Sequence, residues 1–133
     1  MIATDEKVRL DSECFWGRHD FSTGQCPRPN CKAEWKNRVT IRAARWFQKS
    51  CGNTYHSVYI AMPDGTTLNA PYSYGYGEQY MDTALDLIRQ HLEGPGANER
   101  AHAEGLQRIH EYLAPRGMWA EITCSDVERK RDL

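Results

Sequence analysis

KNRVTIRAARWFQ KSCGN TYHSVYIAM PDGTT LNAPYSYGYG EQYMDTALDLIRQHL, residues 36–92, is the stretch of the chain that decides the fold. It contains three runs with strand-like alternation, separated by two turn signals, and it ends in an amphipathic helical pattern. In the first run, Val39, Ile41 and Ala43 alternate with polar residues and therefore share one face of a strand over residues 38–43. The stretch predicts a meander of three antiparallel strands followed by a helix.

The second and third runs continue the same alternation. The residues expected on their apolar faces are His56, Val58, Ile60 and Met62 in the second run, and Leu68, Ala70, Tyr72 and Tyr74 in the third. Gly52 and Asn53 suit the positive φ of a hairpin turn, and the segment 63–65, Pro-Asp-Gly, predicts the next turn. Pro71 lacks an amide hydrogen, which favours an edge position for the third strand.

The helical pattern over residues 78–92 has one apolar stripe, and a second helix is expected over residues 98–113. The stripe consists of Met81, Ala84, Leu85, Ile88 and Leu92. Residues 118–123 alternate again and predict a short fourth strand. The expected fold is α+β: a three- or four-stranded antiparallel sheet in the order β-β-β-α-α-β, with two helices and an N-terminal loop rich in Cys and His.

The chain has 133 residues, which fits a single domain. We divide it into a Cys/His-rich lead-in (1–35), the β-β-β-α core (36–92) and a C-terminal part (98–133) that holds the second helix, the short strand and a charged tail. The first residues lack the apolar region of a secretory signal, and no apolar run reaches the ~20 residues of a membrane span. We therefore expect a cytoplasmic protein with no membrane partner.

Four potential metal ligands lie within eighteen residues in the segment CFWGRHDFSTGQCPRPNC, residues 14–31. They are Cys14, His19, Cys26 and Cys31, spaced C-x4-H-x6-C-x4-C. Glycines and prolines interrupt the segment, so we expect an irregular loop that gathers three thiols and one imidazole. Three cysteines and one histidine form a tetrahedral zinc ligand set, and four protein ligands predict a structural rather than a catalytic ion.

Alternatives to this ligand set remain open from the sequence. Cys51 or His56 could replace His19 as the fourth ligand. The cysteines could also form a disulfide between Cys26 and Cys31, or pack as buried free thiols.

Positive charge is concentrated in the first half of the chain. Residues 1–60 contain ten lysines and arginines against six acidic residues, whereas residues 61–133 contain seven against twelve. The basic block either contacts an acidic partner or faces the acidic half of the same molecule. Basic residues mixed with tyrosines on a sheet face are suited to phosphates and bases, which predicts a nucleic-acid surface. Its candidate residues are Lys36, Arg38, Arg42, Arg45, Tyr55 and Tyr59.

Two other functions compete with nucleic-acid binding. A protein-binding inhibitor or adaptor that acts on a host protein would use exposed aromatic residues such as Trp16, Trp35, Trp46 and Trp119. A hydrolase-like site would use His56, with Cys51 as the nucleophile, but no orienting carboxylate or oxyanion loop accompanies this pair. The sequence therefore favours a non-catalytic binding protein over an enzyme.

The combination of WFQKSCGNTYHSVYI (46–60) with YSYGYGEQY (72–80) resembles small proteins encoded by bacteriophages and prophages. The resemblance covers residues 38–90. It implies a phage or mobile-element accessory protein, and it favours binding of nucleic acid or of a host protein over catalysis.

Overall fold

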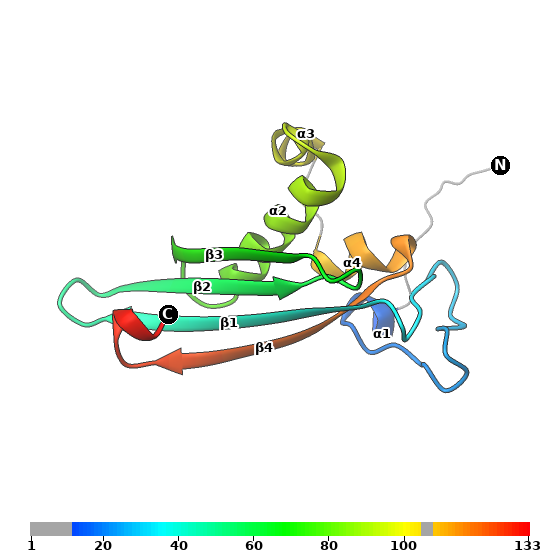
Figure 1. The fold of residues 1–133 in the computed structure, drawn as a ribbon, viewed down its shortest axis with the longest axis horizontal. Helices are drawn as coiled ribbons and strands as arrows, with labels where there is room; N and C mark the ends of the chain where they lie inside the picture. Colours follow the sequence, from blue (N-terminus) through cyan, green and yellow to red (C-terminus); the bar gives the residue numbers. More distant parts are fainter. Residues whose placement is uncertain (1–11, 105–107) are drawn as a thin grey trace.

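The computed structural model describes residues 12–104 and 108–133, which form an α+β fold around one four-stranded sheet (Figure 1). The strands are β1 (Arg38–Gln48), β2 (Asn53–Ala61), β3 (Thr67–Tyr74) and β4 (Trp119–Val127), and their order in the sheet is β3-β2-β1-β4. Residues 1–11 of the predicted lead-in lie outside the described residues.

The predicted meander is present because β1, β2 and β3 pair as successive antiparallel neighbours. On β1, Val39, Ile41 and Ala43 are buried, while Arg38 before them and Arg42 between Ile41 and Ala43 are exposed. The strand continues to Gln48, beyond the predicted end at residue 43. Period-two alternation thus separates a covered face of the sheet from an open one.

One irregularity moves Tyr72 and Tyr74 from the predicted apolar face of β3 to the opposite face, where both contact Tyr55. Between His56 and Val58 the register of the β2–β3 pair shifts, as at a β-bulge. Leu68 and Ala70 keep the apolar side that the sequence predicts, but Tyr74 pairs with Tyr55 on the opposite face. The shift lies at Pro71, in a strand at the edge of the sheet, where a missing ladder donor is tolerated.

The sheet is mixed, so the prediction of a purely antiparallel sheet is wrong. β4 pairs with β1 in the parallel direction, from Arg38 opposite Trp119 to Trp46 opposite Val127. Because the chain reverses direction twice, β3 runs parallel to β1 and its last residue lies at the same end of the sheet as the last residue of β1. The 15-residue helix α2 (Gln79–Glu93) has a length of about 22 Å and carries the chain back, so β4 starts where β1 starts.

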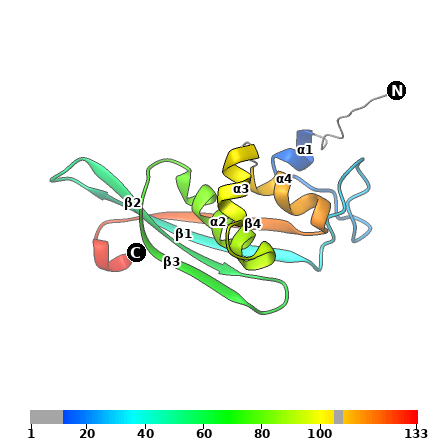
Figure 2. The same ribbon diagram turned by 90° about the horizontal axis from the view of Figure 1, so that it is seen from above.

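The helices cover one face of the sheet (Figure 2). The region predicted as one second helix contains two, α3 (Ala97–Glu104) and α4 (Ile109–Leu113), and the latter continues into a 3₁₀ turn, η1 (Ala114–Arg116). α4 begins anew because Arg108 is extended, with φ −84° and ψ 158°, and its amide donates to the Glu111 side chain. A short helix, α1 (Ser12–Phe15), lies beside α4, and a 3₁₀ turn, η2 (Lys130–Asp132), ends the chain.

The core lies between the sheet and the helices α2 and α4. Its buried members are Val39, Ile41, Ala43, Val58, Ile60, Met62, Tyr80, Ala84, Leu85, Ile88, Ile109, Tyr112, Leu113 and Ala120. Four residues of the predicted α2 stripe are buried or half-buried, whereas Leu92 in the last turn is 43% exposed. Within the described residues, no helix combines the length and apolar character needed to cross a membrane.

Ile88 and Leu92 form a matched pair for testing this core, since both belong to the same helical stripe. Ile88 is fully buried, so Ile88→Ala should lower the free energy of unfolding by about 2–5 kcal/mol. Leu92→Ala should cost less than about 1 kcal/mol because its side chain already contacts solvent. Urea unfolding followed by circular dichroism measures both, and equal losses would contradict the assignment of the core.

Candidate metal centre and open sheet face

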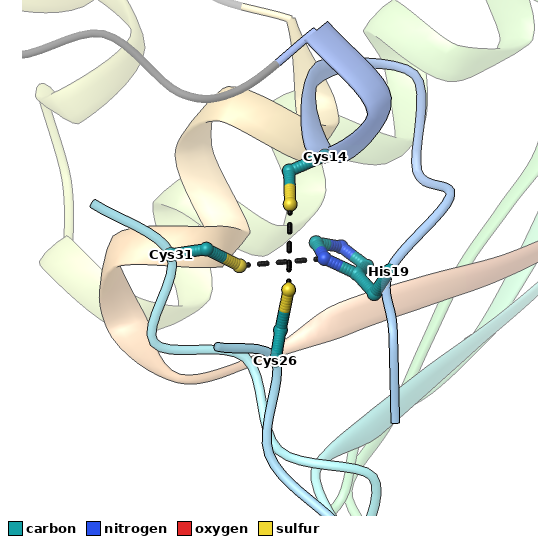
Figure 3. A group of neighbouring side chains, drawn as sticks. All are labelled: Cys14, His19, Cys26 and Cys31. Carbon is teal, nitrogen blue, oxygen red and sulfur yellow. Dashed lines mark hydrogen bonds between the residues drawn. The ribbon is translucent and has the colours of Figure 1, made fainter. Parts of the chain in front are cut away.

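Three thiols and one imidazole converge in the N-terminal loop (Figure 3). Cys14 comes from α1, and His19, Cys26 and Cys31 come from the loop that leads to β1. Cys14 Sγ lies 3.5 Å from Cys26 Sγ, and Cys31 Sγ lies 3.3 Å from His19 Nδ1. All four ligand atoms lie within 4.8 Å of one another, so the structure brings together the four residues that the sequence predicts.

Tight turns in the loop bring these side chains together. After Cys14 the chain turns at Gly17, whose amide donates to the Cys14 carbonyl and whose φ is +83°. A side chain at Gly17 would collide with the His110 ring, which lies 2.6 Å from the position of its Cβ. Cys26 is fixed by a hydrogen bond from its amide to the Ala33 carbonyl, and Cys31 by one to Arg28.

The spacing of the four atoms fits one tetrahedral ion. Metal–sulfur bonds of about 2.3 Å place two sulfurs of a tetrahedral site about 3.8 Å apart. The observed separations bracket this distance. Cys14, Cys26 and Cys31 are buried, so the site is closed by protein on its sulfur side. This group can therefore hold a metal ion.

Burial determines the protonation of these groups. It lowers the pKa of His19 to about 4, which keeps the imidazole neutral near pH 7, as a metal ligand must be. Burial also raises the pKa of the Cys31 thiol to about 12. A thiolate there needs a strong neighbouring positive charge. At Cys14, Arg28 Nη1 lies 3.6 Å from Sγ and favours the thiolate, and a divalent cation would stabilise all three thiolates far more.

The alternative ligands lie elsewhere. Cys51 is exposed in the β1–β2 turn. His56 is buried under α2, where Nδ1 contacts the Gly75 carbonyl at 3.1 Å and Nε2 contacts Thr83 Oγ1 at 2.7 Å. Both ring nitrogens of His56 therefore have partners within the core. All five cysteines are free thiols, so the alternative Cys26–Cys31 disulfide is not formed.

An aromatic cluster joins the metal loop, defined as residues 14–37 with the four candidate ligands, to the sheet. The Trp35 ring stacks on Trp119 of β4 with centroids 5.1 Å apart, and Phe21 from the loop lies against both rings. Trp119 Nε1 donates to the Trp35 carbonyl at 3.1 Å, and the Trp35 amide donates to Gly24 at 2.8 Å. The geometry of the metal loop therefore sets the position of Trp35 at the end of the sheet.

The open face, defined as the face of the sheet turned away from α2 and α4, carries most of the predicted nucleic-acid residues. Arg42 lies opposite Tyr59 in the β1–β2 pair, and both side chains are exposed. Arg38 forms an ion pair of 3.3 Å with Glu121. Tyr55, on the same face as Tyr59, stacks between Trp46 and Tyr72.

Two ends of this face differ. At the end near the metal loop, a shallow pocket of about 390 Å³ is lined by Trp35, Lys36 and Arg38 with Thr40 and residues 61–63. At the other end the C-terminal turn η2 reaches back, and Lys130 Nζ lies 4.9 Å from the centre of the Tyr72 ring. The tail thus crosses the face from β4 to β3, which are the two edges of the sheet.

Arg45 does not belong to this surface. It lies on the covered side, in register with His56. Its Nε donates to Asp126 at 2.9 Å, and its Nη1 donates to the Gly77 carbonyl at 2.8 Å. It therefore joins β1 to β4 and to the start of α2. The alternation in the sequence would have placed Arg45 on the covered face, because it lies two residues after Ala43. The predicted strand, residues 38–43, did not include it.

The comparisons with known proteins give no relative to which a function can be tied. No protein-family model, no curated protein and no solved structure matches this chain.

Replacing one of the four ligands should abolish metal binding. For Cys26→Ser we expect metal content well below the level of about one ion per chain predicted for the unaltered protein, and a lower Tm, since metal binding and folding are coupled. Cys51→Ser is the control, because that thiol is exposed and distant from the cluster, and it should change neither quantity. Elemental analysis and thermal unfolding provide the measurements. Folded protein without metal would contradict the assignment.

Proposed function

We propose that this chain is a non-catalytic nucleic-acid-binding module, and that its open face binds single-stranded nucleic acid. The observation that carries the proposal is the pairing of exposed Arg42 with exposed Tyr59 in the middle of a sheet face that no α-helix of residues 12–104 and 108–133 covers. A guanidinium beside an aromatic ring offers one group for a phosphate and one for a stacked base. Stacking platforms of this kind tolerate many sequences, because every base has an aromatic face.

The metal-loop end of the face extends this surface. Trp35 is 55% exposed while its ring rests on Trp119, so one of its sides is available for stacking. Lys36 and Arg38 line the pocket beside it, each near one carboxylate: Glu34 at 3.5 Å and Glu121 at 3.3 Å. Both pairs are exposed to solvent, where such ion pairs contribute little, so both cations can turn to a phosphate.

The dimensions suit a short single strand. The eight residue steps from Arg38 to Trp46 span about 26 Å along β1. This length suits the lower part of the range of about 4–16 nucleotides found for single-strand sites of one small domain. Lys130 adds a further cation above Tyr72 at the far end.

We infer that the ion in the Cys14/His19/Cys26/Cys31 group is a structural zinc. Three thiols and an imidazole are zinc ligands, and four protein ligands leave no position for a substrate. Its role in the proposed function is to hold the loop that carries Phe21 and Trp35 against Trp119. Chelation should therefore weaken nucleic-acid binding through the loss of Trp35 from the surface.

A protein partner is the second candidate. Trp16 is 55% exposed and lies at a groove of about 670 Å³ between α1, α2 and α4, beside Arg108. An exposed tryptophan next to an arginine is typical of a binding hot spot. A phage or mobile-element origin, inferred from the resemblance of residues 38–90, agrees with either role. Trp16→Ala should abolish capture of such a partner and leave nucleic-acid binding intact.

Arg42→Glu tests the nucleic-acid surface directly. We expect at least a tenfold loss of affinity for a single-stranded oligonucleotide at low salt, because a phosphate contact is replaced by a repulsive charge. The slope of log K against log salt should fall by about 0.7 in magnitude for the lost contact. Tyr59→Ala should cost about 1–3 kcal/mol of binding free energy through lost stacking.

Arg108→Glu is the charge-matched control, because Arg108 is exposed at the start of α4, in the helical layer on the other side of the sheet. Fluorescence anisotropy with a labelled oligonucleotide measures all three variants. Equal binding by Arg42→Glu and the unaltered protein, or equal losses in Arg42→Glu and Arg108→Glu, would refute the proposed surface.

A further inference from the structure

Three arginines from three elements line one pocket in the helical layer. The pocket has a volume of about 250 Å³ and lies between α2, α3 and η1, which contribute Arg89, Arg100 and Arg116. We call it the arginine pocket. It lies on the covered side of the sheet, among the helices, and shares no lining residue with the open face.

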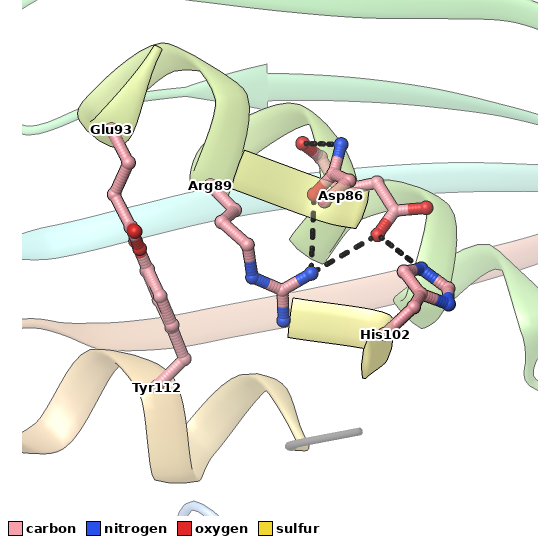
Figure 4. A network of polar contacts seen from close by, with 6 residues as sticks. Asp86, Arg89, Glu93, His102 and Tyr112 are labelled. Atoms are coloured by element: carbon pink, nitrogen blue, oxygen red, sulfur yellow. Dashed lines mark hydrogen bonds and ion pairs between the residues drawn. The ribbon is translucent and has the colours of Figure 1, made fainter. Parts of the chain in front are cut away.

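Arg89 is the fixed member of the pocket. Its residue surface is only 2% exposed, and its Nη1 donates to Asn98 Oδ1 at 3.1 Å and to Asp86 Oδ1 at 3.3 Å. Asn98 Nδ2 in turn donates to the Asp86 carbonyl at 3.1 Å (Figure 4). Both of these Arg89 bonds use one terminal nitrogen, and the figure shows the other pointing away from Asp86 toward the helix that carries Tyr112. The guanidinium is therefore held in one orientation.

The Tyr112 ring contacts both Arg89 and the second arginine, Arg116. The Arg116 guanidinium lies 3.7 Å from the centre of the Tyr112 ring, and that of Arg89 lies 5.4 Å from it. The Tyr112 hydroxyl donates to Glu93 Oε2 at 2.5 Å, and Arg116 Nη2 lies 3.6 Å from the same oxygen. Burial raises the pKa of Tyr112 to about 12, so the phenol keeps its proton and remains a donor to Glu93. Glu93 Oε2 thus accepts a hydrogen bond from Tyr112 and forms an ion pair with Arg116.

Arg100 supplies a third guanidinium from the opposite wall. It is exposed, and its Nη1 lies against Gly96, 3.1 Å from the position a Cβ would take there. In the part of the chain that the structure describes, Arg100 forms no ion pair. Among the described side chains, Asp86 and Glu93, the latter in the lining of the pocket, are already engaged by the other two arginines. Among the described residues, this pocket therefore has more guanidinium donors than carboxylate acceptors.

We propose that the arginine pocket binds a small phosphate-class oxyanion, either free or as the phosphate of a monoester. Guanidinium groups present planar, paired donors that match the oxygens of phosphate, and three of them approach the pocket from different walls. The volume lies below the range of about 300–1,000 Å³ that is typical of sites for drug-sized ligands, so it suits the anion rather than a whole nucleotide. The site does not depend on the proposed nucleic-acid surface.

The test follows the arginine Nε–Hε signals by NMR during titration with inorganic phosphate at constant ionic strength. We expect saturable shifts at Arg89, Arg100 and Arg116, and none at Arg129, which is exposed in the C-terminal tail. Arg100→Gln should weaken binding about tenfold, since a hydrogen bond to a charged group contributes about 1.5–3 kcal/mol. Arg100 is exposed and its replacement leaves the buried network intact, so this variant should stay folded.

Arg129→Gln is the matched control and should titrate like the unaltered protein. A phosphate monoester that binds more tightly than inorganic phosphate would identify a phosphorylated ligand, and the reverse order would identify free phosphate. Non-saturating shifts, unchanged affinity in Arg100→Gln, or equal affinity for acetate would each overturn the proposal.

Discussion

The strand β1 imposes the constraint on which the rest of the structure depends. It is paired on both sides, antiparallel with β2 and parallel with β4, so every side chain must take one face or the other. Val39 and Ile41 are fully buried, and this fixes Arg42 on the open side. A slip of one residue would bury the arginine and expose the core. The register of β1 therefore determines both which residues form the core and which form the proposed binding surface.

The metal loop extends this constraint beyond the sheet. Its four candidate ligands come from a segment with little regular structure. The Phe21, Trp35 and Trp119 rings transmit the loop geometry to β4, and thereby to the end of the open face. An ion bound by these four residues would add its binding free energy directly to the folding of the segment.

The sequence allowed prediction of those features that follow from local spacing. Alternation gave the faces of β1 and β2, and the clustering of Cys14, His19, Cys26 and Cys31 gave the candidate metal ligands.

The features that could not be predicted from the sequence arise from long-range geometry. Local alternation does not encode the direction of β4, which is set by the return of the chain through α2. The register shift at Pro71 moves Tyr74 to the other face, and no local pattern marks a shift that depends on the partner strand. Arg45 was misplaced because its strand was predicted too short.

The central claim is that the two faces of the sheet have different tasks, one structural and one in binding. Mapping of NMR chemical shifts during titration with a single-stranded oligonucleotide tests it most directly. We expect saturable changes at Trp35, Arg38, Arg42 and Tyr59, with Ile88 and Leu113 in the core unaffected. Saturable changes confined to the helices, or no saturable change at low salt, would contradict it.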